Sequence, residues 1–404
     1  MIRPSTLRWG RAVCHVMLAA VMLAAVMLAA TACGPPRRDA SAVAGGDGAP
    51  GRLLAAPADF RGYPVLQEMV QTSVRILYRS TSGVDGSRTA VSGTVFVPNG
   101  RPPAGGWPVA AIGHPTSGLS SPCAPSAYPG LMGNLTSIIP FLELGFVVVL
   151  PDYQGLGTPG RHAYLDSTTE AYNVIDAVRA AREVVSAASD AWISYGVSQG
   201  GQAVWAANEL AADYGRGLRL EGSISIAAPT DLRPLVDEMV AGTLTTPQKV
   251  LLPMLLRGLQ VLHPELRLAD YLHGTMLSRI DVFLSCAGEQ EGLKSMVADA
   301  APPSETTPID AAAADRLRGW LGRSALPQRP ASAPMLVAYG DADQVVLPAW
   351  TREGVRRACA IGDVIDLQVA PGQGHGMLDL GTTPVTWVKD RLAGVPPPNT
   401  CPQP

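Results

Sequence analysis

The chain has 404 residues and a formal net charge of −3, and hydrophobic residues make up 47% of it. Charged residues account for only 16%, and no run of Lys or Arg forms a basic stripe, so a nucleic acid is excluded as a partner. A chain of this length and composition can bury one large hydrophobic core or two smaller ones.

The N-terminal residues predict an export signal. Residues 1–32 combine three arginines with an apolar run that ends in small residues, which is typical of a secretory signal peptide. A membrane anchor is the alternative, since the run is nearly long enough to span a bilayer. Cys33 stands at the expected cleavage boundary and resembles the acylated cysteine of a bacterial lipoprotein. Its lipid would then anchor the protein to a membrane. Plain secretion is the alternative. Residues 33–56 predict a flexible linker.

Beyond the linker, apolar runs rich in Val and Ile alternate with segments of helical periodicity. Strands are expected at residues 90–98, 109–114, 145–153, 191–198, 220–229, 333–341 and 364–372, and helices at 168–188 and 383–394. Several of the runs are almost continuously apolar, as expected for strands that are covered on both faces. The alternation predicts an α/β fold with a doubly wound, mostly parallel sheet.

One region interrupts this alternation. Residues 231–330 contain no convincing strand and include a Leu-rich helical stretch at 246–262. We interpret them as a helical cap inserted between two parts of the core, 57–230 and 331–404; a second, independent domain is the alternative. Because the 246–262 stretch is apolar on most sides, it must be buried all round or face an apolar ligand.

A serine in a tight turn is the first candidate for chemistry. Ser198 lies in Gly-Val-Ser-Gln-Gly, between a predicted strand and a predicted helix, where a nucleophile would project from the sheet. A serine nucleophile needs a base. Among the 6 histidines, His375 is favoured because it lies in a glycine-flanked loop after the last predicted strand. His114 and His162 also lie in or next to loops.

The base in turn needs a carboxylate that orients it. Asp341 and Asp343 lie at the end of the strand expected at 333–341. Either gives the chain order serine, acid, histidine that is found in α/β-hydrolases. Asp152 precedes the serine and would break that order.

Six segments taken together resemble one family. HPTSGLSSPCAPS, DYQGLGTPGRHAYL, YGVSQGG, AAPTDL, GDADQVVLP and GQGH are similar to segments of the secretory lipases, the lipase A-type enzymes of Candida yeasts and their actinobacterial relatives. The resemblance runs from about Leu53 to Cys401. It implies an α/β-hydrolase fold with an inserted helical cap or lid, and no cofactor or metal.

The resemblance also assigns roles to residues. It implies Ser198 as nucleophile, Asp343 rather than Asp341 as acid, and His375 as base. The oxyanion hole would consist of the backbone N–H groups of Gln199 and Thr116; Pro115, where relatives often carry glycine, has no N–H. Of the three pairings open to four cysteines, the family pattern implies Cys123–Cys286 and Cys359–Cys401.

These observations predict an exported serine carboxylester hydrolase, a lipase or esterase, that cleaves acyl esters such as triacylglycerols. A serine peptidase or acyltransferase on the same fold is one alternative, because a triad and an oxyanion hole serve any acyl transfer. A non-catalytic surface protein that binds lipid is the other.

Overall fold

The computed structural model describes residues 48–376 and 378–402. The predicted signal peptide at 1–32 and Cys33 lie outside these residues. Within the described part of the chain, no helix is both long and apolar enough to cross a membrane.

A nine-stranded sheet forms the centre of the described chain, in the order β1-β2-β3-β5-β4-β6-β7-β8-β9. The strands are β1 (Ala58–Asp59), β2 (Val70–Thr81), β3 (Arg88–Pro98), β4 (Trp107–Gly113), β5 (Val147–Pro151), β6 (Ala188–Val197), β7 (Arg219–Ile226), β8 (Met335–Gly340) and β9 (Ile365–Ala370). The pairs from β1 to β5 are antiparallel, and those from β5 to β9 are parallel. Every residue of β5 is buried, which explains why the strand is apolar throughout.

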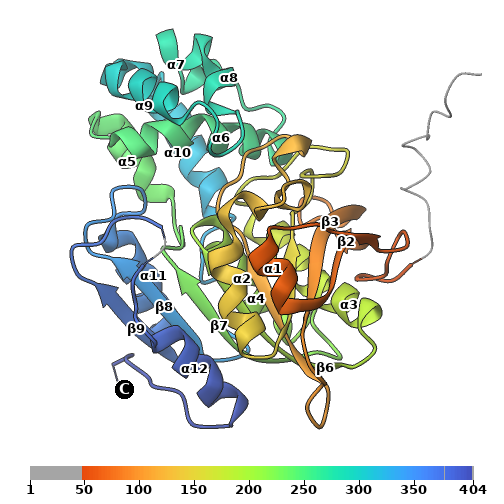
Figure 1. The fold of residues 1–404 in the computed structure, drawn as a ribbon. Helices are drawn as coiled ribbons and strands as arrows, with labels where there is room; N and C mark the ends of the chain where they lie inside the picture. The colour runs from red at the N-terminus through yellow and green to blue at the C-terminus, as the bar shows by residue number, and fades with distance from the viewer. Residues whose placement is uncertain (1–47, 377, 403–404) are drawn as a thin grey trace, which may run out of the picture. The chain divides into compact units, whose positions relative to one another are not determined.

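Helices cover both faces of the sheet (Figure 1). They are α1 (Pro64–Met69), α2 (Leu135–Glu143), α3 (Ser167–Val184), α4 (Gln199–Ala211), α11 (Pro348–Ala360) and α12 (Thr383–Leu392). α3, α4 and α11 pack against the face that carries Val109 and Ala111, whereas α1, α2 and α12 pack against the face that carries Ala110 and Ile112. The faces alternate residue by residue because successive strand side chains point to opposite sides. The predicted α/β fold is confirmed.

A helical segment joins β7 to β8. It contains α5 (Arg233–Ala241), α6 (Thr246–Leu262), α7 (Gly274–Ser278), α8 (Ile280–Phe283), α9 (Glu291–Ala300) and α10 (Ala311–Gly322), the green-to-cyan group at the top of Figure 1. Their apolar side chains form a hydrophobic cluster separate from those on the sheet. α6 begins with a capping box in which Thr245 and Gln248 each accept the other's backbone N–H, and this fixes where the helix starts. The segment lies within residues 231–330, which were expected to form the cap.

The seven predicted strands correspond to β3–β9, but the structure adds a long strand that the sequence analysis missed. β2 pairs with β3 along almost its whole length. Its sequence, VQTSVRILYRST, mixes polar and apolar residues, because it lies near the edge of the sheet and is only partly covered.

The predicted linker, residues 33–56, extends too far at its C-terminal end. The backbone N–H groups of Gly51 and Leu54 donate to Arg79 O and Leu77 O on β2. Residues 51–54 therefore pair with the sheet, which a composition rich in Gly, Ala and Pro does not reveal.

Candidate active site

Ser198 occupies the turn between β6 and α4. Its φ of 56° and ψ of −121° are unusual for a residue with a side chain, a strain that is common at functional sites. Three glycines allow the turn to form. A Cβ on Gly200 would lie 1.9 Å from Gly113 O, and one on Gly196 would lie 2.1 Å from Gly200 O. Only glycine fits there, so the chain holds Ser198 at the start of α4.

A hydrogen-bonded relay joins three residues that are far apart in the sequence. His375 Nε2 lies 2.8 Å from Ser198 Oγ, and His375 Nδ1 lies 2.8 Å from Asp343 Oδ2. Asp343 is 3% exposed, and its other oxygen, Oδ1, accepts the backbone N–H groups of Val345 and Val346. The carboxylate is thus held in one orientation, with Oδ2 toward the imidazole.

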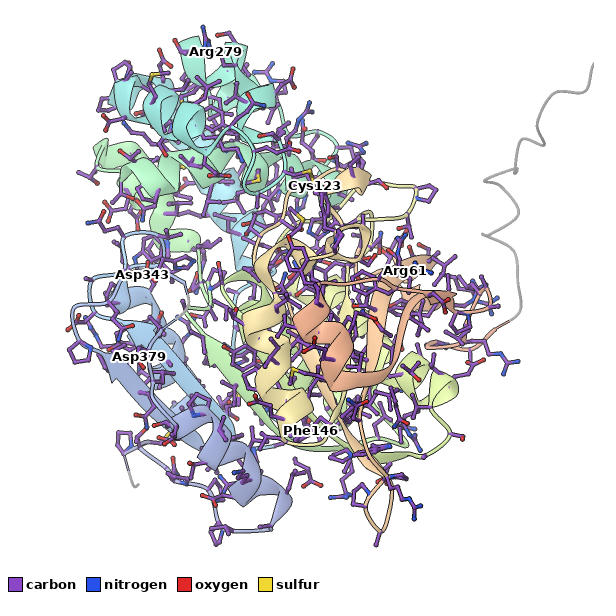
Figure 2. The ribbon with its side chains drawn as sticks, in the orientation of Figure 1. Arg61, Cys123, Phe146, Arg279, Asp343 and Asp379 are labelled. Atoms are coloured by element: carbon purple, nitrogen blue, oxygen red, sulfur yellow. A yellow bond between two sulfur atoms is a disulfide. The ribbon has the colours of Figure 1, made fainter. Side chains whose placement is uncertain are left out.

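The loop that carries His375 is held by residues at the end of β8. Asp341 Oδ1 accepts the N–H of Gly372 at 2.6 Å, and a Cβ on Gly340 would lie 2.1 Å from Gln373 O. Asp341 therefore supports the turn before His375, whereas Asp343 contacts the imidazole itself. Figure 2 labels Asp343 near the end of β8.

The other candidates from the sequence lie in different surroundings. Asp152 is buried and accepts hydrogen bonds from Ser92 Oγ and from the N–H and Oγ of Ser126. The ring nitrogens of His114 lie 2.7 Å from Pro115 O and 3.2 Å from Asp152 O. Burial lowers the pKa of His114, and the neutral ring donates its single N–H to one of these two oxygens. None of these groups is bonded to Ser198 or His375, so the alternative acid and base do not join the relay.

The two backbone N–H groups expected to form the oxyanion hole belong to Gln199 and Thr116. Within residues 48–376 and 378–402, the structure provides no hydrogen-bond acceptor for the N–H of Gln199 or of Thr116. The Gln199 N–H belongs to the first turn of α4, where backbone donors lack a helical partner. Thr116 lines a cavity together with Ser198 and His375. Neither N–H group is thus committed to an acceptor within the described residues.

A second cavity reaches Ser198 from beneath α6. It has a volume of about 40 Å³ and is lined mainly by apolar side chains, among them Leu232, Leu235, Leu251, Leu252, Leu255 and Val346. An adjoining cavity shares Tyr164, Leu165, Leu232 and Leu255 with it and reaches Leu262 and Ser324. The apolar surface of α6 is therefore divided between the hydrophobic cluster of the cap and the space beside the serine.

Both expected disulfides are present in the structure. Cys123 is bonded to Cys286, and Cys359 to Cys401. The first bond joins the loop after β4, near Thr116, to the segment that holds α5–α10; Cys123 is labelled in Figure 2. The second joins α11 to the C-terminal tail. The pairing implied by the family resemblance is confirmed.

The sequence analysis missed a buried polar group behind the serine turn. Glu170, in the first turn of α3, is 0% exposed, and its Oε1 accepts hydrogen bonds from Gln199 Nε2 and Leu165 N. His162 Nε2 contacts the same Gln199 nitrogen at 2.9 Å. The available signal was an acidic residue on the apolar face of a predicted helix, close to the DYQGLGTPGRHAYL segment.

A model of the secretory lipase family matches residues 131–301, a span that includes Ser198 and ends before Asp343 and His375. No curated protein matches the chain. The resemblance to the secretory lipases is confirmed.

Solved structures agree on the fold. Candida antarctica lipase A in its closed state aligns with a TM-score of 0.70 at 18% identity, over 87% of this chain and 84% of that one. The rice cell wall degrading esterase LipA of Xanthomonas oryzae aligns with a TM-score of 0.64 at 21% identity, over 86% and 97%. A putative hydrolase of Legionella pneumophila aligns with a TM-score of 0.64 at 18% identity, over 82% and 92%.

The fold is therefore that of the α/β-hydrolases. Together with the family match, these likenesses support a carboxylic ester hydrolase of the lipase or esterase type. The two disulfides and the match to a secretory family also support an exported protein.

Proposed function

We propose that this protein is an exported serine carboxylester hydrolase that cleaves acyl esters through an acyl-enzyme on Ser198. The observation that carries the proposal is the unbroken relay from Ser198 Oγ through His375 to the buried Asp343. A serine hydroxyl is a weak nucleophile until an oriented base removes its proton, and the relay supplies such a base.

The reaction follows from the geometry. Ser198 Oγ attacks the ester carbonyl carbon while His375 Nε2 accepts its proton, and Asp343 stabilises the resulting imidazolium through Nδ1–H. The N–H groups of Gln199 and Thr116 donate to the oxyanion of the tetrahedral intermediate, each contributing roughly 3 kcal/mol to its stability. The imidazolium then protonates the leaving alcohol. Water, deprotonated by His375, hydrolyses the acyl-enzyme and releases the acid.

The apolar cavity beneath α6 supports an acyl chain as the substrate group bound there. We propose that residues 231–330 act as a cap over Ser198 and that α6 supplies the acyl-binding surface, with Leu252 and Leu255 among its contacts. Apolar lining with few polar groups is what a hydrocarbon chain requires. Triacylglycerols and simpler acyl esters are the substrates of this class.

We also propose that residues 1–32 direct export and that Cys33 is acylated, which would anchor the enzyme at the cell surface. The paired cysteines support an oxidising location. Mass spectrometry of the mature N-terminus tests this: a lipid on Cys33 supports the anchor, and an unmodified N-terminus after cleavage indicates plain secretion.

A fluorophosphonate reagent tests the nucleophile. The wild-type protein is expected to be labelled and Ser198→Ala to be unlabelled. Ser194→Ala is the matched control and should still be labelled, because Ser194 lies on β6 before the turn and its hydroxyl donates to Ser223 Oγ on β7. An unlabelled wild type, or undiminished labelling of Ser198→Ala, would overturn the proposal. A panel of p-nitrophenyl esters and peptide substrates then separates an esterase from a peptidase.

A further inference from the structure

The last part of the loop before α3 is buried, although it contains no regular secondary structure. The exposed fractions of His162, Ala163, Tyr164 and Leu165 range from 1% to 8%. Loops usually run over the surface, since buried backbone must find hydrogen-bond partners. This segment, residues 162–165, contacts both of the loops that carry the proposed oxyanion donors.

On one side, the 162–165 segment holds the side chain of Gln199. His162 Nδ1 lies 2.9 Å from Gln154 O and must donate to it, which leaves Nε2 as an acceptor for Gln199 Nε2. Burial lowers the pKa of His162 to about 3 and keeps the ring neutral. Glu170 Oε1 accepts the second Gln199 amide hydrogen at 2.7 Å. The side chain next to one oxyanion donor is therefore fixed at two points.

On the other side, the 162–165 segment holds Thr116. The Tyr164 hydroxyl lies 2.7 Å from Thr116 Oγ1. Tyr164 is in turn fixed by α6, because a Cβ on Gly258 would lie 2.7 Å from Tyr164 Cβ. Tyr164 also lines the apolar cavity beside Ser198, so the same ring contacts the proposed acyl site and the second donor.

Burying the Glu170 carboxyl group costs free energy, and its hydrogen bonds hold the loop before α3. Leu165 has a φ of 61°, a conformation that costs a residue with a side chain about 1–2 kcal/mol, and Glu170 accepts its N–H at 3.0 Å. Among the described residues, no Lys or Arg forms an ion pair with Glu170. Burial of this carboxyl raises its pKa well above the usual range. A buried carboxyl group without a cationic partner lowers the stability of the fold. We therefore attribute its role to positioning the groups that bond to it.

We propose that Tyr164 and Glu170 are positioning residues of the oxyanion hole, and that the 162–165 segment holds the N–H groups of Thr116 and Gln199 at a fixed separation. The inference rests on the proposed function. The two donors come from different segments, after β4 and at the start of α4. These segments pack directly on each other at Gly113 and Gly200, and the 162–165 segment is a further element that contacts both. Fixed donors stabilise the transition state because they need no reorganisation when charge develops.

Three variants distinguish a role in positioning the oxyanion donors from a role in folding stability alone. Tyr164→Phe removes the hydroxyl and keeps the ring, Glu170→Leu removes both hydrogen bonds, and Glu170→Gln keeps an acceptor at the same place. With a p-nitrophenyl ester, Tyr164→Phe should lower kcat about 10-fold and Glu170→Leu about 100-fold, with KM changed less than about threefold, as displacement of a catalytic donor predicts. Glu170→Gln should retain kcat within about threefold, since its amide oxygen still accepts.

A transition-state analogue provides the decisive readout. An alkyl trifluoromethyl ketone forms a hemiketal whose oxygen occupies the oxyanion position, so its Ki should rise in proportion to the loss in kcat/KM. Tyr271→Phe and Glu209→Leu are matched controls, because they remove a buried tyrosine hydroxyl bond to Ala313 O and a buried glutamate that accepts two backbone N–H groups. They should lower the melting temperature and leave kcat and Ki unchanged.

Three results would overturn the inference. One is a loss of kcat in Tyr164→Phe and Glu170→Leu no greater than in the two controls. Another is a fall in kcat with an unchanged Ki for the ketone. A wild-type protein that neither hydrolyses esters nor reacts with a fluorophosphonate would overturn the proposed function and this inference together.

Discussion

Replacing Asp343 by asparagine should invert the hydrogen-bonding role of His375. Asp343 Oδ1 accepts two backbone N–H groups, from Val345 and Val346, while Oδ2 faces the imidazole. In Asp343→Asn these two donors hold the amide oxygen at the Oδ1 position, so the NH₂ group must face His375 Nδ1. Nδ1 then accepts, the proton moves to Nε2, and Nε2 no longer has a lone pair for the proton of Ser198.

The expected loss is about 10⁴-fold in kcat, which is the usual effect of the wrong histidine tautomer in a serine triad and corresponds to about 5 kcal/mol of transition-state stabilisation. Asp341→Asn is the matched control two residues away. Its amide oxygen can still accept the N–H of Gly372, so kcat should stay within about threefold of wild type.

Initial rates on a p-nitrophenyl ester, normalised to the folded fraction from circular dichroism, measure both variants. If Asp341→Asn proves the damaging change, or if Asp343→Asn retains more than a hundredth of wild-type kcat, the assignment of the acid is wrong.

Other expectations can be checked with single variants. Leu252→Trp fills the cavity beneath α6, and each substrate methylene that can no longer be buried there should lower kcat/KM for a dodecanoate ester about fourfold, while a butyrate ester is little affected; equal losses on both esters would mean that the chain binds elsewhere. Loss of the Cys123–Cys286 bond in Cys286→Ser should lower the free energy of unfolding by roughly 2–5 kcal/mol, measured in urea, and an unchanged midpoint would show that the bond does not constrain the chain. Burial raises the pKa of Glu209 from its ordinary value of 4.5 to about 7, so the folded state binds this proton more tightly. Stability from this group is complete below pH 4.5 and falls, by up to about 3 kcal/mol, as the pH rises through 7. Glu209→Gln should flatten that slope, and a slope that persists would assign it to another group.

Local geometry is what the sequence by itself determined. The serine turn could be predicted because Gly113, Gly196 and Gly200 pack backbone against backbone with no room for a Cβ, and no other residue type can replace them. β5 could be predicted because a strand covered on both faces must be apolar at every position. The insertion between β7 and β8 was visible for a related reason, since its apolar residues lack the pattern of strands.

Contacts across the chain were decided only by the tertiary structure. Asp341 and Asp343 follow the same strand and differ in the sequence by two positions, so the residues alone left both open. Because of the way the His375 loop packs against the end of β8, Asp343 contacts the imidazole and Asp341 accepts the N–H of Gly372. Glu170 was not recognised for the same reason, because its partners Gln199 and Leu165 come from separate elements. The residue pattern along one helix does not show which residues of other elements pack against it. A sequence specifies which residues can turn, pair or be buried nearby, whereas the identity of a distant partner depends on how the elements pack.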